Sequence, residues 1–417
     1  MNSVYLERLT PLPSDWKAGT IGDYCEVKTG GTPSTKVPSY YHPPEIFWVK
    51  SGDVKGRRIQ NPPNQISRQG MSKSAAKLLP RGSVMIAMSG RGKTRGTTAV
   101  LEVEAACSQS VAAMIPTDKL ESEFLHYQFV KRYDEVRNIT GSDDRSGLNL
   151  ALIRAISIAI PPLSEQKKIA HILSTVQRAI EAQERVIQTT TELKKALMHK
   201  LFTEGLRHEP QKQTEIGPVP ASWGIKTVGD YCDILNGYAF KSEDYVTTGG
   251  IPNFRVVNIS WDGTVSMDDC KSLPESFAES HAKYLLSERD ILFVMVGATR
   301  GKLAQIPASI LPALMNQNMW RIVPSRAGIN RDYLFHHLRR SVVGLLQEDD
   351  DQARGFFKKS DFRNIPLAIP TLEEQIEIRT VLETLENKLS QHAAKAAQLK
   401  DLFRTLLQQL MTAKIRF

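Results

Sequence analysis

A regular stripe of apolar residues runs through the end of the chain. Its members recur at alternating spacings of four and three residues, with one histidine among them: Ile378, Leu382, Leu385, Leu389, His392, Ala396, Leu399, Phe403, Leu406 and Leu410. An average repeat of 3.5 residues is typical of a helix that packs along another helix as a coiled coil. The pattern therefore predicts a long helix over residues 370–417.

A second stripe, 209 residues earlier, predicts a matching helix over residues 161–204. It is more polar than the first: Ile169, Leu173, Val176, Ile180, Gln183, Ile187, Thr190, Lys194, Leu197 and Leu201. We expect Leu193 to replace Lys194 in part at the helix seam. An alternative is that each stripe packs on its own globular domain. We favour the coiled coil, because about 40 helical residues span roughly 60 Å, more than a domain of roughly 160 residues measures.

The two stripes belong to a duplication that covers the whole chain. Residues 13–16 (Pro-Ser-Asp-Trp) recur 207 residues later as residues 220–223 (Pro-Ala-Ser-Trp). Residues 160–166 (Ile-Pro-Pro-Leu-Ser-Glu-Gln) recur at an offset of 209 as residues 369–375 (Ile-Pro-Thr-Leu-Glu-Glu-Gln). Two copies are too few for a solenoid, so they predict a duplicated unit with internal pseudo-two-fold symmetry.

Each repeat begins with a globular part of mixed structure. Short β-rich runs alternate with turn clusters, and one helical stretch follows, over residues 121–136 and 330–346. Prolines precede each long helix, and Ser164 and Thr371 are the expected N-caps. The predicted domains are therefore residues 1–160 and 205–369, each followed by a long helix, 161–204 and 370–417.

The connection between the repeats predicts how the helices run. Parallel helices would require the linker over residues 203–220 to return about 60 Å, which is its whole length when fully extended. Antiparallel helices require no return. The predicted fold class is α+β: two similar α/β domains separated by a long antiparallel two-helix coiled coil.

Composition favours an anionic partner. The chain has 417 residues, with 54 Lys and Arg against 45 Asp and Glu, for a net charge of +9. Such an excess favours binding to a polyanion without proving it. No apolar run approaches the 18 residues of a membrane span, and the four cysteines form no CxxC pair. We expect a cytoplasmic protein with no disulfide framework and no bound metal.

The motifs that suggest catalysis are each incomplete. Residues 87–94 fit a relaxed phosphate-binding loop, but residues 95–100 are typical of a strand, whereas a P-loop opens a helix. Residues 61–64 (Asn-Pro-Pro-Asn) lack the aromatic ring that an amino-methyltransferase stacks on its flipped base. Glu26 and Lys28 resemble a nuclease site only faintly, and the second repeat has no equivalent lysine. We therefore predict no catalytic residues.

Basic residues gather instead at glycine-containing turns of the globular parts. Glycine lets a backbone approach a phosphate, while Arg and Lys neutralise phosphates or read guanine. Gly-Lys pairs at residues 92–93 and 301–302 recur just after the same predicted strand of each repeat, which favours a shared role over a solvated basic rim. The candidate DNA-binding residues are Lys50, Lys55, Arg57, Arg58, Arg91, Lys93 and Arg95 in the first repeat, and Asn253, Arg255, Asn258, Arg300, Lys302, Arg354 and Lys358 in the second.

Three features together resemble the specificity subunit of type I restriction-modification systems. They are the duplicated Pro-x-x-Trp start, the segments at residues 31–34 (Gly-Thr-Pro-Ser) and 240–242 (Phe-Lys-Ser), and the duplicated Ile-Pro-x-Leu-x-Glu-Gln before each helix. The resemblance covers essentially the whole chain. The polar seam of the first helix departs from the simplest form of the pattern.

The resemblance implies a function in double-stranded DNA recognition. Each globular part would be a target recognition domain that reads one half of an asymmetric bipartite site, and the helices would set the gap. The chain would carry no activity or cofactor of its own. Two modification subunits using S-adenosylmethionine would dock on the helices, and restriction subunits using ATP and Mg²⁺ would join them. The helix residues expected at this subunit interface are Ile169, Leu173, Val176, Ile180, Leu382, Leu385, Leu389 and Leu399.

Two other classes of protein remain as alternatives. A coiled-coil scaffold without a DNA role would share the helices, but the basic, glycine-flanked loops argue against it. A fused enzyme would share the length of the chain, but it lacks a complete catalytic motif. Salt-dependent binding to duplex DNA distinguishes the DNA-binding hypothesis from the scaffold.

Overall fold

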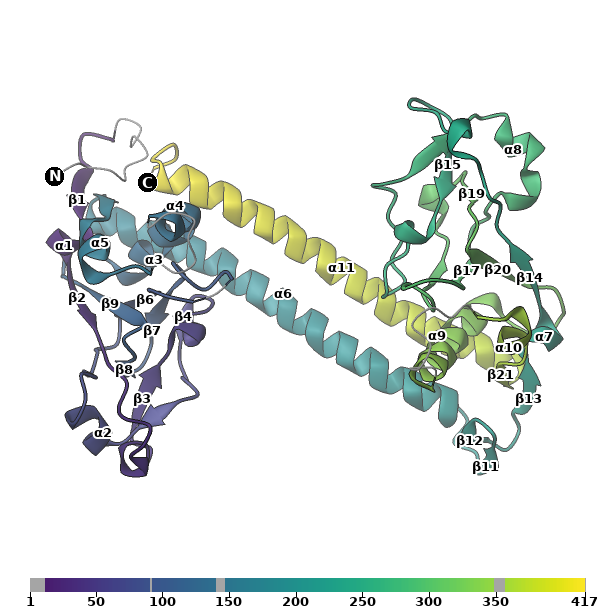
Figure 1. Ribbon diagram of the computed structural model, residues 1–417, viewed down its shortest axis with the longest axis horizontal. Coiled ribbons are helices and arrows are strands. Elements are labelled where there is room, and N and C mark those ends of the chain that lie inside the picture. Colours follow the sequence, from purple (N-terminus) through teal and green to yellow (C-terminus); the bar gives the residue numbers. More distant parts are fainter. Residues whose placement is uncertain (1–11, 91, 140–146, 349–356, 417) are drawn as a thin grey trace. The chain divides into compact units, whose positions relative to one another are not determined.

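The computed structural model describes residues 12–90, 92–139, 147–348 and 357–416. It divides into two compact units, each with one globular part and portions of both long helices (Figure 1). Unit 1 comprises residues 1–186 and 392–417, and unit 2 comprises residues 187–391. Each unit therefore combines a globular part with helix segments from both repeats.

The described residues of the globular part of unit 1 form three sheets. The largest has the order β2 (Cys25–Thr29), β9 (Val111–Pro116), β6 (Val84–Ala87), β7 (Thr98–Leu101) and β4 (Arg58–Ile59). A smaller sheet places β3 (Ile46–Val49) between antiparallel β5 (Gln65–Ile66) and parallel β8 (Ala106–Cys107). The third sheet pairs β1 (Lys17–Thr20) with β10 (Ser157–Ile160), just before the long helix.

The globular part of unit 2 repeats this topology. Its main sheet has the order β14 (Cys232–Asn236), β20 (Met319–Pro324), β17 (Ile291–Val294) and β18 (Leu303–Gln305). The smaller sheet places β15 (Ile251–Phe254) between antiparallel β16 (Lys271–Leu273) and parallel β19 (Leu314–Met315). Strand β13 (Gly224–Thr227) pairs with β21 (Pro366–Ile369), and a hairpin of β11 (Gln211–Thr214) and β12 (Gly217–Pro220) precedes them.

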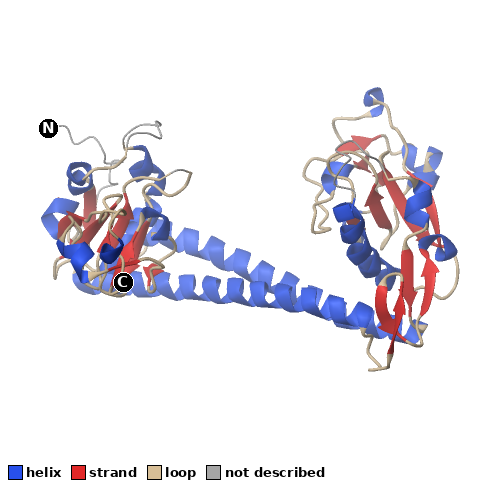
Figure 2. Cartoon of the chain, turned by 60° about the horizontal axis from the view of Figure 1, so that its bottom comes forward, coloured by secondary structure: helices blue, strands red, loops and turns tan. Residues whose placement is uncertain are grey.

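Helices lie against these sheets, as the blue and red segments of each globular part show (Figure 2). The helical stretch predicted in each repeat is confirmed, with a break in the first. There α3 (Ser122–Lys131) and α4 (Tyr133–Asn138) meet at Arg132, whereas unit 2 has the single helix α9 (Arg331–Glu348). The shorter helices are α1 (Ile21–Tyr24), α2 (Arg68–Ser72) and α5 (Leu150–Ala155) in unit 1, and α7 (Val228–Tyr231), α8 (Phe277–Ser280) and α10 (Lys359–Arg363) in unit 2.

The two predicted long helices are α6 (Leu163–Thr203) and α11 (Leu372–Met411). In unit 1, the start of α6 meets the end of α11, where Glu165 accepts hydrogen bonds from Arg416, and Glu184 pairs with Lys400. In unit 2, Lys194 pairs with Glu386, and further along α6 Leu201 and Phe202 share a buried cluster with Ile378 and Leu382 of α11. Residue numbers rise along one helix as they fall along the other, so the antiparallel pairing is confirmed in each unit.

The predicted helix seam is also confirmed, because every residue of both stripes is buried or half-buried. The polar seam residue Gln183 accepts a 2.7 Å hydrogen bond at its Oε1 atom from the Nδ1 of His392, its equivalent in the second repeat. The expectation for Leu193 is wrong, since its side chain is 55% exposed and Lys194 occupies the seam. An ion pair with Glu386 lets the lysine stay there.

The helix caps agree with the prediction in one repeat. The Oγ1 atom of Thr371 accepts a hydrogen bond from the backbone N–H of Glu374 at 3.3 Å, as an N-cap does. The expected cap at Ser164 is wrong, because α6 already begins at Leu163. Within the described residues, no helix is long and apolar enough to cross a membrane.

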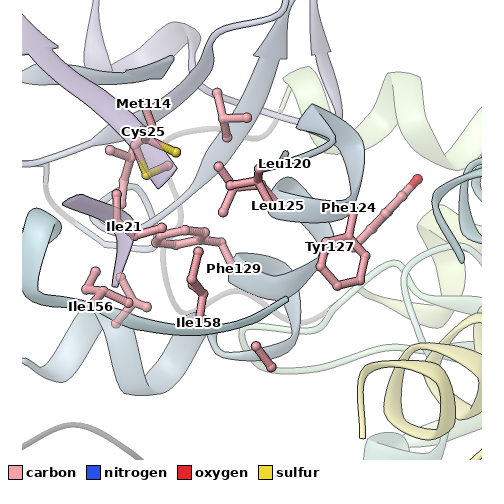
Figure 3. Close-up of a cluster of buried hydrophobic side chains, with 14 of the residues drawn as sticks. Ile21, Cys25, Met114, Leu120, Phe124, Leu125, Tyr127, Phe129, Ile156 and Ile158 are labelled. Carbon is pink, nitrogen blue, oxygen red and sulfur yellow. The ribbon is translucent and has the colours of Figure 1, made fainter. Parts of the chain in front are cut away.

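The main core of unit 1 joins the globular part to both helices. Ile21, Phe124 and Leu125 of the globular part belong to one buried cluster (Figure 3). The same cluster takes Leu173 from α6 and Leu410 from α11. In unit 2, a corresponding cluster combines Trp223 and Tyr333 with residues of the two helices: Leu201, Phe202, Ile378 and Leu382. Burial of these apolar faces supplies the main stabilising term at each junction.

Candidate nucleic-acid interface

The repeated sequence motifs first account for how each domain is attached to its helix. The indole N–H of Trp16 donates to the Glu165 carboxylate at 3.2 Å, and Trp223 donates to Glu374 at 3.1 Å. All four side chains are buried. In each repeat, a buried hydrogen bond therefore joins the tryptophan of the Pro-x-x-Trp start to the glutamate of the Ile-Pro-x-Leu-x-Glu-Gln motif.

The glutamine of that motif forms a second fixed connection. In unit 1, the Gln166 side chain accepts from the backbone N–H of Glu121 at 2.8 Å and donates to two carbonyls, those of Lys119 and Pro161. Gln375 makes the equivalent three bonds to Asn330, Gly328 and Pro370. A buried amide with its hydrogen bonds satisfied holds the helix start in one orientation.

The first basic loop of unit 1 (residues 50–58) follows strand β3. Lys50 is exposed; its Nζ lies 5.0 Å from the centre of the Trp48 ring and 2.9 Å from the amide oxygen of Asn64. Lys55 is also exposed. Arg57 is buried and pairs with Glu123 at 3.0 Å, and Arg58 pairs with Glu102 and Glu123. The loop thus presents its lysines to solvent and turns its arginines toward carboxylates.

The second basic loop of unit 1 (residues 88–97) joins β6 to β7. Lys93 is exposed, and its carbonyl accepts a 2.7 Å hydrogen bond from the Tyr133 hydroxyl. Arg95 is buried, and Arg91 lies outside the described residues. The Thr97 hydroxyl donates to the carbonyl of Val54 at 2.8 Å, which brings the two basic loops of unit 1 together. Strand β7 follows this loop, so it does not open a helix as a P-loop does.

The first basic loop of unit 2 (residues 255–263) follows strand β15, the equivalent of β3. Arg255 is half-buried and donates to the carbonyl of Asp269. Asn258 is buried and closes the turn, accepting from the backbone N–H of Arg255 and donating to the carbonyl of Ser266. Asn253 is buried, and its amide donates to the Tyr245 hydroxyl at 2.8 Å. The hydrogen bonds of these two buried asparagines therefore stabilise the conformation of the loop.

The second basic loop of unit 2 (residues 295–302) joins β17 to β18. Lys302 is half-buried; its Nζ donates to the carbonyl of Ile259 at 2.6 Å and lies 5.8 Å from the Trp261 ring centre. Arg300 lies over the ring of Phe357 at 5.4 Å. Lys358 is exposed next to Phe357, whereas Arg354 lies outside the described residues. Unit 2 therefore also brings its two basic loops together.

Both Gly-Lys pairs follow the equivalent strand, β6 in unit 1 and β17 in unit 2, as predicted, but they occupy different positions in the loop. Gly301 donates to the carbonyl of Val294 at the base of its loop, as Gly96 donates to Ala87 in unit 1. Lys302 therefore corresponds to Thr97, and its contact with the first basic loop is the one that Thr97 makes. Lys93 lies further out, because the loop of unit 1 is two residues longer between its strands, residues 88–97 against 295–302.

A model of one protein family matches most of the chain, in two copies. It is described as the type I restriction modification DNA specificity domain, and it matches residues 13–190 and 220–401. The chain belongs to this type I DNA specificity family. The two matches coincide with the duplication, so each repeat contributes one copy of the specificity domain.

Relatives of this specificity subunit match it along nearly its whole length. One is the type I restriction enzyme MjaVIII specificity subunit of Methanocaldococcus jannaschii, 22% identical over 97% of this chain and 94% of the relative. The MjaIX specificity subunit of the same organism is 24% identical over the same shares. The crystal structure of a type I restriction-modification S subunit from M. genitalium shares the fold, with a TM-score of 0.65 at 15% identity, covering 97% and 98% of the two chains.

The helix residues predicted for the interface of the specificity subunit with its partners are covered within the chain. Ile169, Leu173, Ile180 and Leu382 are buried, and Val176, Leu385, Leu389 and Leu399 are half-buried along the seam. The large apolar residues that the two helices expose are different ones: Leu163, Val186, Leu193, Leu372, Ile376 and Leu402.

Sequence reasoning missed a group of basic residues beside the second basic loop of unit 2. Lys195 of α6 and Arg339 and Arg340 of α9 line one groove with Trp261. The adjacent pairs Lys194-Lys195 and Arg339-Arg340 were visible signals in the sequence. They lie on predicted helices, where charged residues are usually interpreted as a solvated face.

Proposed function

We propose that each unit of this specificity subunit reads one half of an asymmetric bipartite site in double-stranded DNA, and that α6 and α11 set the gap between the halves. One observation carries the proposal. The two units share the contacts that attach domain to helix, Trp16–Glu165 and Trp223–Glu374, but differ at the two basic loops. A shared framework with different loops suits a protein that reads two different sequences.

The exposed residues of the basic loops are the proposed DNA contacts. Lys50, Lys55 and Lys93 serve unit 1, and Lys358 serves unit 2 with the partly exposed Arg255, Arg300 and Lys302. Arg57 and Arg58 are not among the proposed direct contacts, because Glu102 and Glu123 neutralise them. Their ion pairs hold the first basic loop in place instead. Exposed lysines on loops are suited to phosphate contacts. Such contacts position a protein on DNA without reading its sequence.

The proposed assembly follows the family. Two modification subunits dock on the long helices, where the exposed apolar residues Val186, Leu193 and Leu402 offer contact surface. Methylation with S-adenosylmethionine belongs to those subunits, and ATP and Mg²⁺ belong to restriction subunits. In this proposal the chain itself carries no catalysis and determines where the assembled enzyme acts.

An exchange of one domain tests the proposal. Residues 221–369, which begin after the β11–β12 hairpin and end before α11, are replaced by the equivalent segment of a relative with the same Pro-x-x-Trp start. The assembled methyltransferase is then used to methylate genomic DNA, and the modified motif is read by sequencing. We expect one half-site to change while the other half-site and the gap stay the same. A change in both half-sites, or none, would contradict it.

A further inference from the structure

Unit 2 contains a groove of about 650 Å³ between α6, α9 and the two basic loops. Its walls carry Lys194 and Lys195 from α6, Arg339 and Arg340 from α9, and Trp261 from the first basic loop. The indole of Trp261 is 61% exposed, a large value for an aromatic side chain. The groove therefore joins a basic wall to an open aromatic surface.

The charges of this groove are only partly neutralised. Lys194 pairs with Glu386, and Arg339 donates to the carbonyl of Asp262, whose carboxylate also interacts with the charge of Arg339. Within the described part of the chain, neither Lys195 nor Arg340 forms an ion pair. Partial burial lowers the pKa of the Arg340 guanidinium from its usual value. A cation that is partly desolvated without a carboxylate is stabilised by an incoming anion.

The corresponding groove of unit 1, about 390 Å³, has a less basic lining. The equivalents of Lys195 and Arg340, which are Arg404 and Lys131, are also basic but do not line it. At the positions of Lys194 and Arg339 it has Phe403 and Val130, and Gly56 stands where unit 2 has Trp261. Its basic lining residue, Arg57, is paired with Glu123. The shared fold therefore does not require a basic groove at this place, and the basic lining of the groove is a feature of unit 2.

The groove is continuous with the proposed DNA-binding loops. Gly301 of the second basic loop lines it, and the Nζ of Lys302 lies 5.8 Å from the Trp261 ring centre. Trp261 lines the groove together with Lys195 and Arg340. An apolar ring beside two cations suits a DNA backbone, in which deoxyribose and phosphates alternate along the strand.

We propose that this groove binds the sugar–phosphate backbone of the DNA next to the half-site read by unit 2, with Lys195 of α6 and Arg340 of α9 contacting phosphates. The inference rests on the proposed function and extends it: a helix that sets the gap also contributes to binding. An acidic segment of a partner protein is the competing occupant. The continuity with the basic loops favours DNA.

The test is DNA binding by the assembled complex of this chain with its modification subunits. Fluorescence anisotropy measures affinity across a salt series for a duplex carrying the methylated motif and for a random-sequence duplex. Each lost phosphate contact lowers the slope of log affinity against log salt by about one. We expect a decrease of about one for Lys195→Ala and about two for Lys195→Ala combined with Arg340→Ala. Both duplexes lose affinity by the same factor, because phosphates carry no sequence information.

A matched control lies at the equivalent position of the other helix. Arg404 of α11 corresponds to Lys195 at the offset of 209 and is also exposed. Arg404→Ala removes the same charge and is expected to leave the salt slope unchanged, and Lys195→Arg is expected to preserve it. These variants separate the groove from the net charge of the complex.

Each contrary outcome has a distinct meaning. An unchanged slope for the double variant, with binding to the motif retained, overturns the groove proposal. Loss of assembly with the modification subunits, at an unchanged slope, assigns the groove to a protein partner. If the wild-type complex binds both duplexes equally, the proposed function itself fails.

Discussion

In unit 1, Phe403 of α11 packs edge-on against Tyr127 of α3 with ring centres 5.9 Å apart. In unit 2, the equivalent positions hold Lys194 and His336, and the lysine pairs with Glu386. The same junction between domain and helix is thus aromatic in one repeat and ionic in the other. The comparison teaches that this fold requires a filled seam at the junction and tolerates either chemistry there.

The difference has consequences for stability, because apolar and ionic contacts respond to different conditions. Apolar burial is insensitive to pH and is strengthened by many salts, whereas a partly exposed ion pair is screened by salt. We therefore expect unit 2 to be the more sensitive unit to acid and salt. Fluorine NMR of 5-fluorotryptophan measures each unit separately, through Trp16 and Trp48 in unit 1 and Trp223 and Trp320 in unit 2.

The largest expected effect is acid destabilisation of unit 2. Burial lowers the pKa of His336 to about 4 and that of His337 to about 3, whereas unit 1 has one such residue, His126, with a pKa lowered to about 3. The unfolded chain binds a proton near pH 6.5, so stability is present above pH 6.5 and is lost as the pH falls toward these values. At pH 5 each histidine costs about 2 kcal/mol, so unit 2 should lose about 4 kcal/mol and unit 1 about 2.

Urea titrations at pH 7 and pH 5, followed by fluorine NMR, measure the two losses. The variant His336→Tyr, which introduces the residue that unit 1 has at this position, should reduce the loss in unit 2 by about half. Equal losses in both units would contradict the assignment of acid sensitivity to these buried histidines.

The next effect concerns the aromatic junction of unit 1. Phe403→Ala removes the contact with Tyr127 and part of the apolar cover of the core, so we expect unit 1 to lose about 2–3 kcal/mol. Urea midpoints from Trp16 and Trp48 measure the loss. The neighbouring variant Leu402→Ala is the control, since this exposed side chain should cost at most about 0.5 kcal/mol. A loss spread equally over both units would show that the junction does not act locally.

The smallest effect is expected at the ionic junction. Lys194→Met replaces the charged end by an apolar one of similar length, and the partly exposed Glu386 stays hydrated. Unit 2 should change by less than about 1 kcal/mol, because partly exposed ion pairs contribute little net stability. The salt dependence of its urea midpoint should decrease at the same time. A loss above about 2 kcal/mol would mean that the pair is needed to hold the junction together.

The elements of this chain were largely predictable, because their signals are local or periodic. A 3.5-residue stripe indicates a helix seam wherever it occurs, and α6 and α11 follow the stripes closely. The duplicated motifs at Trp16 and Trp223 indicated one topology used twice, and the short linker indicated antiparallel helices. These inferences need spacing and chain length alone, so they did not depend on knowing the contacts.

The roles of individual residues depended on contacts between distant parts of the chain. Arg57 and Lys93 look alike in the sequence, but a carboxylate 66 residues away neutralises Arg57. The equivalence of Lys302 with Thr97 follows from strand register and loop length, which motif matching does not reveal. The groove of unit 2 joins residues near positions 195, 261 and 340, and packing alone brings them together. Periodicity therefore predicts elements, whereas the charge and exposure of a side chain are set by neighbours that only the folded chain supplies.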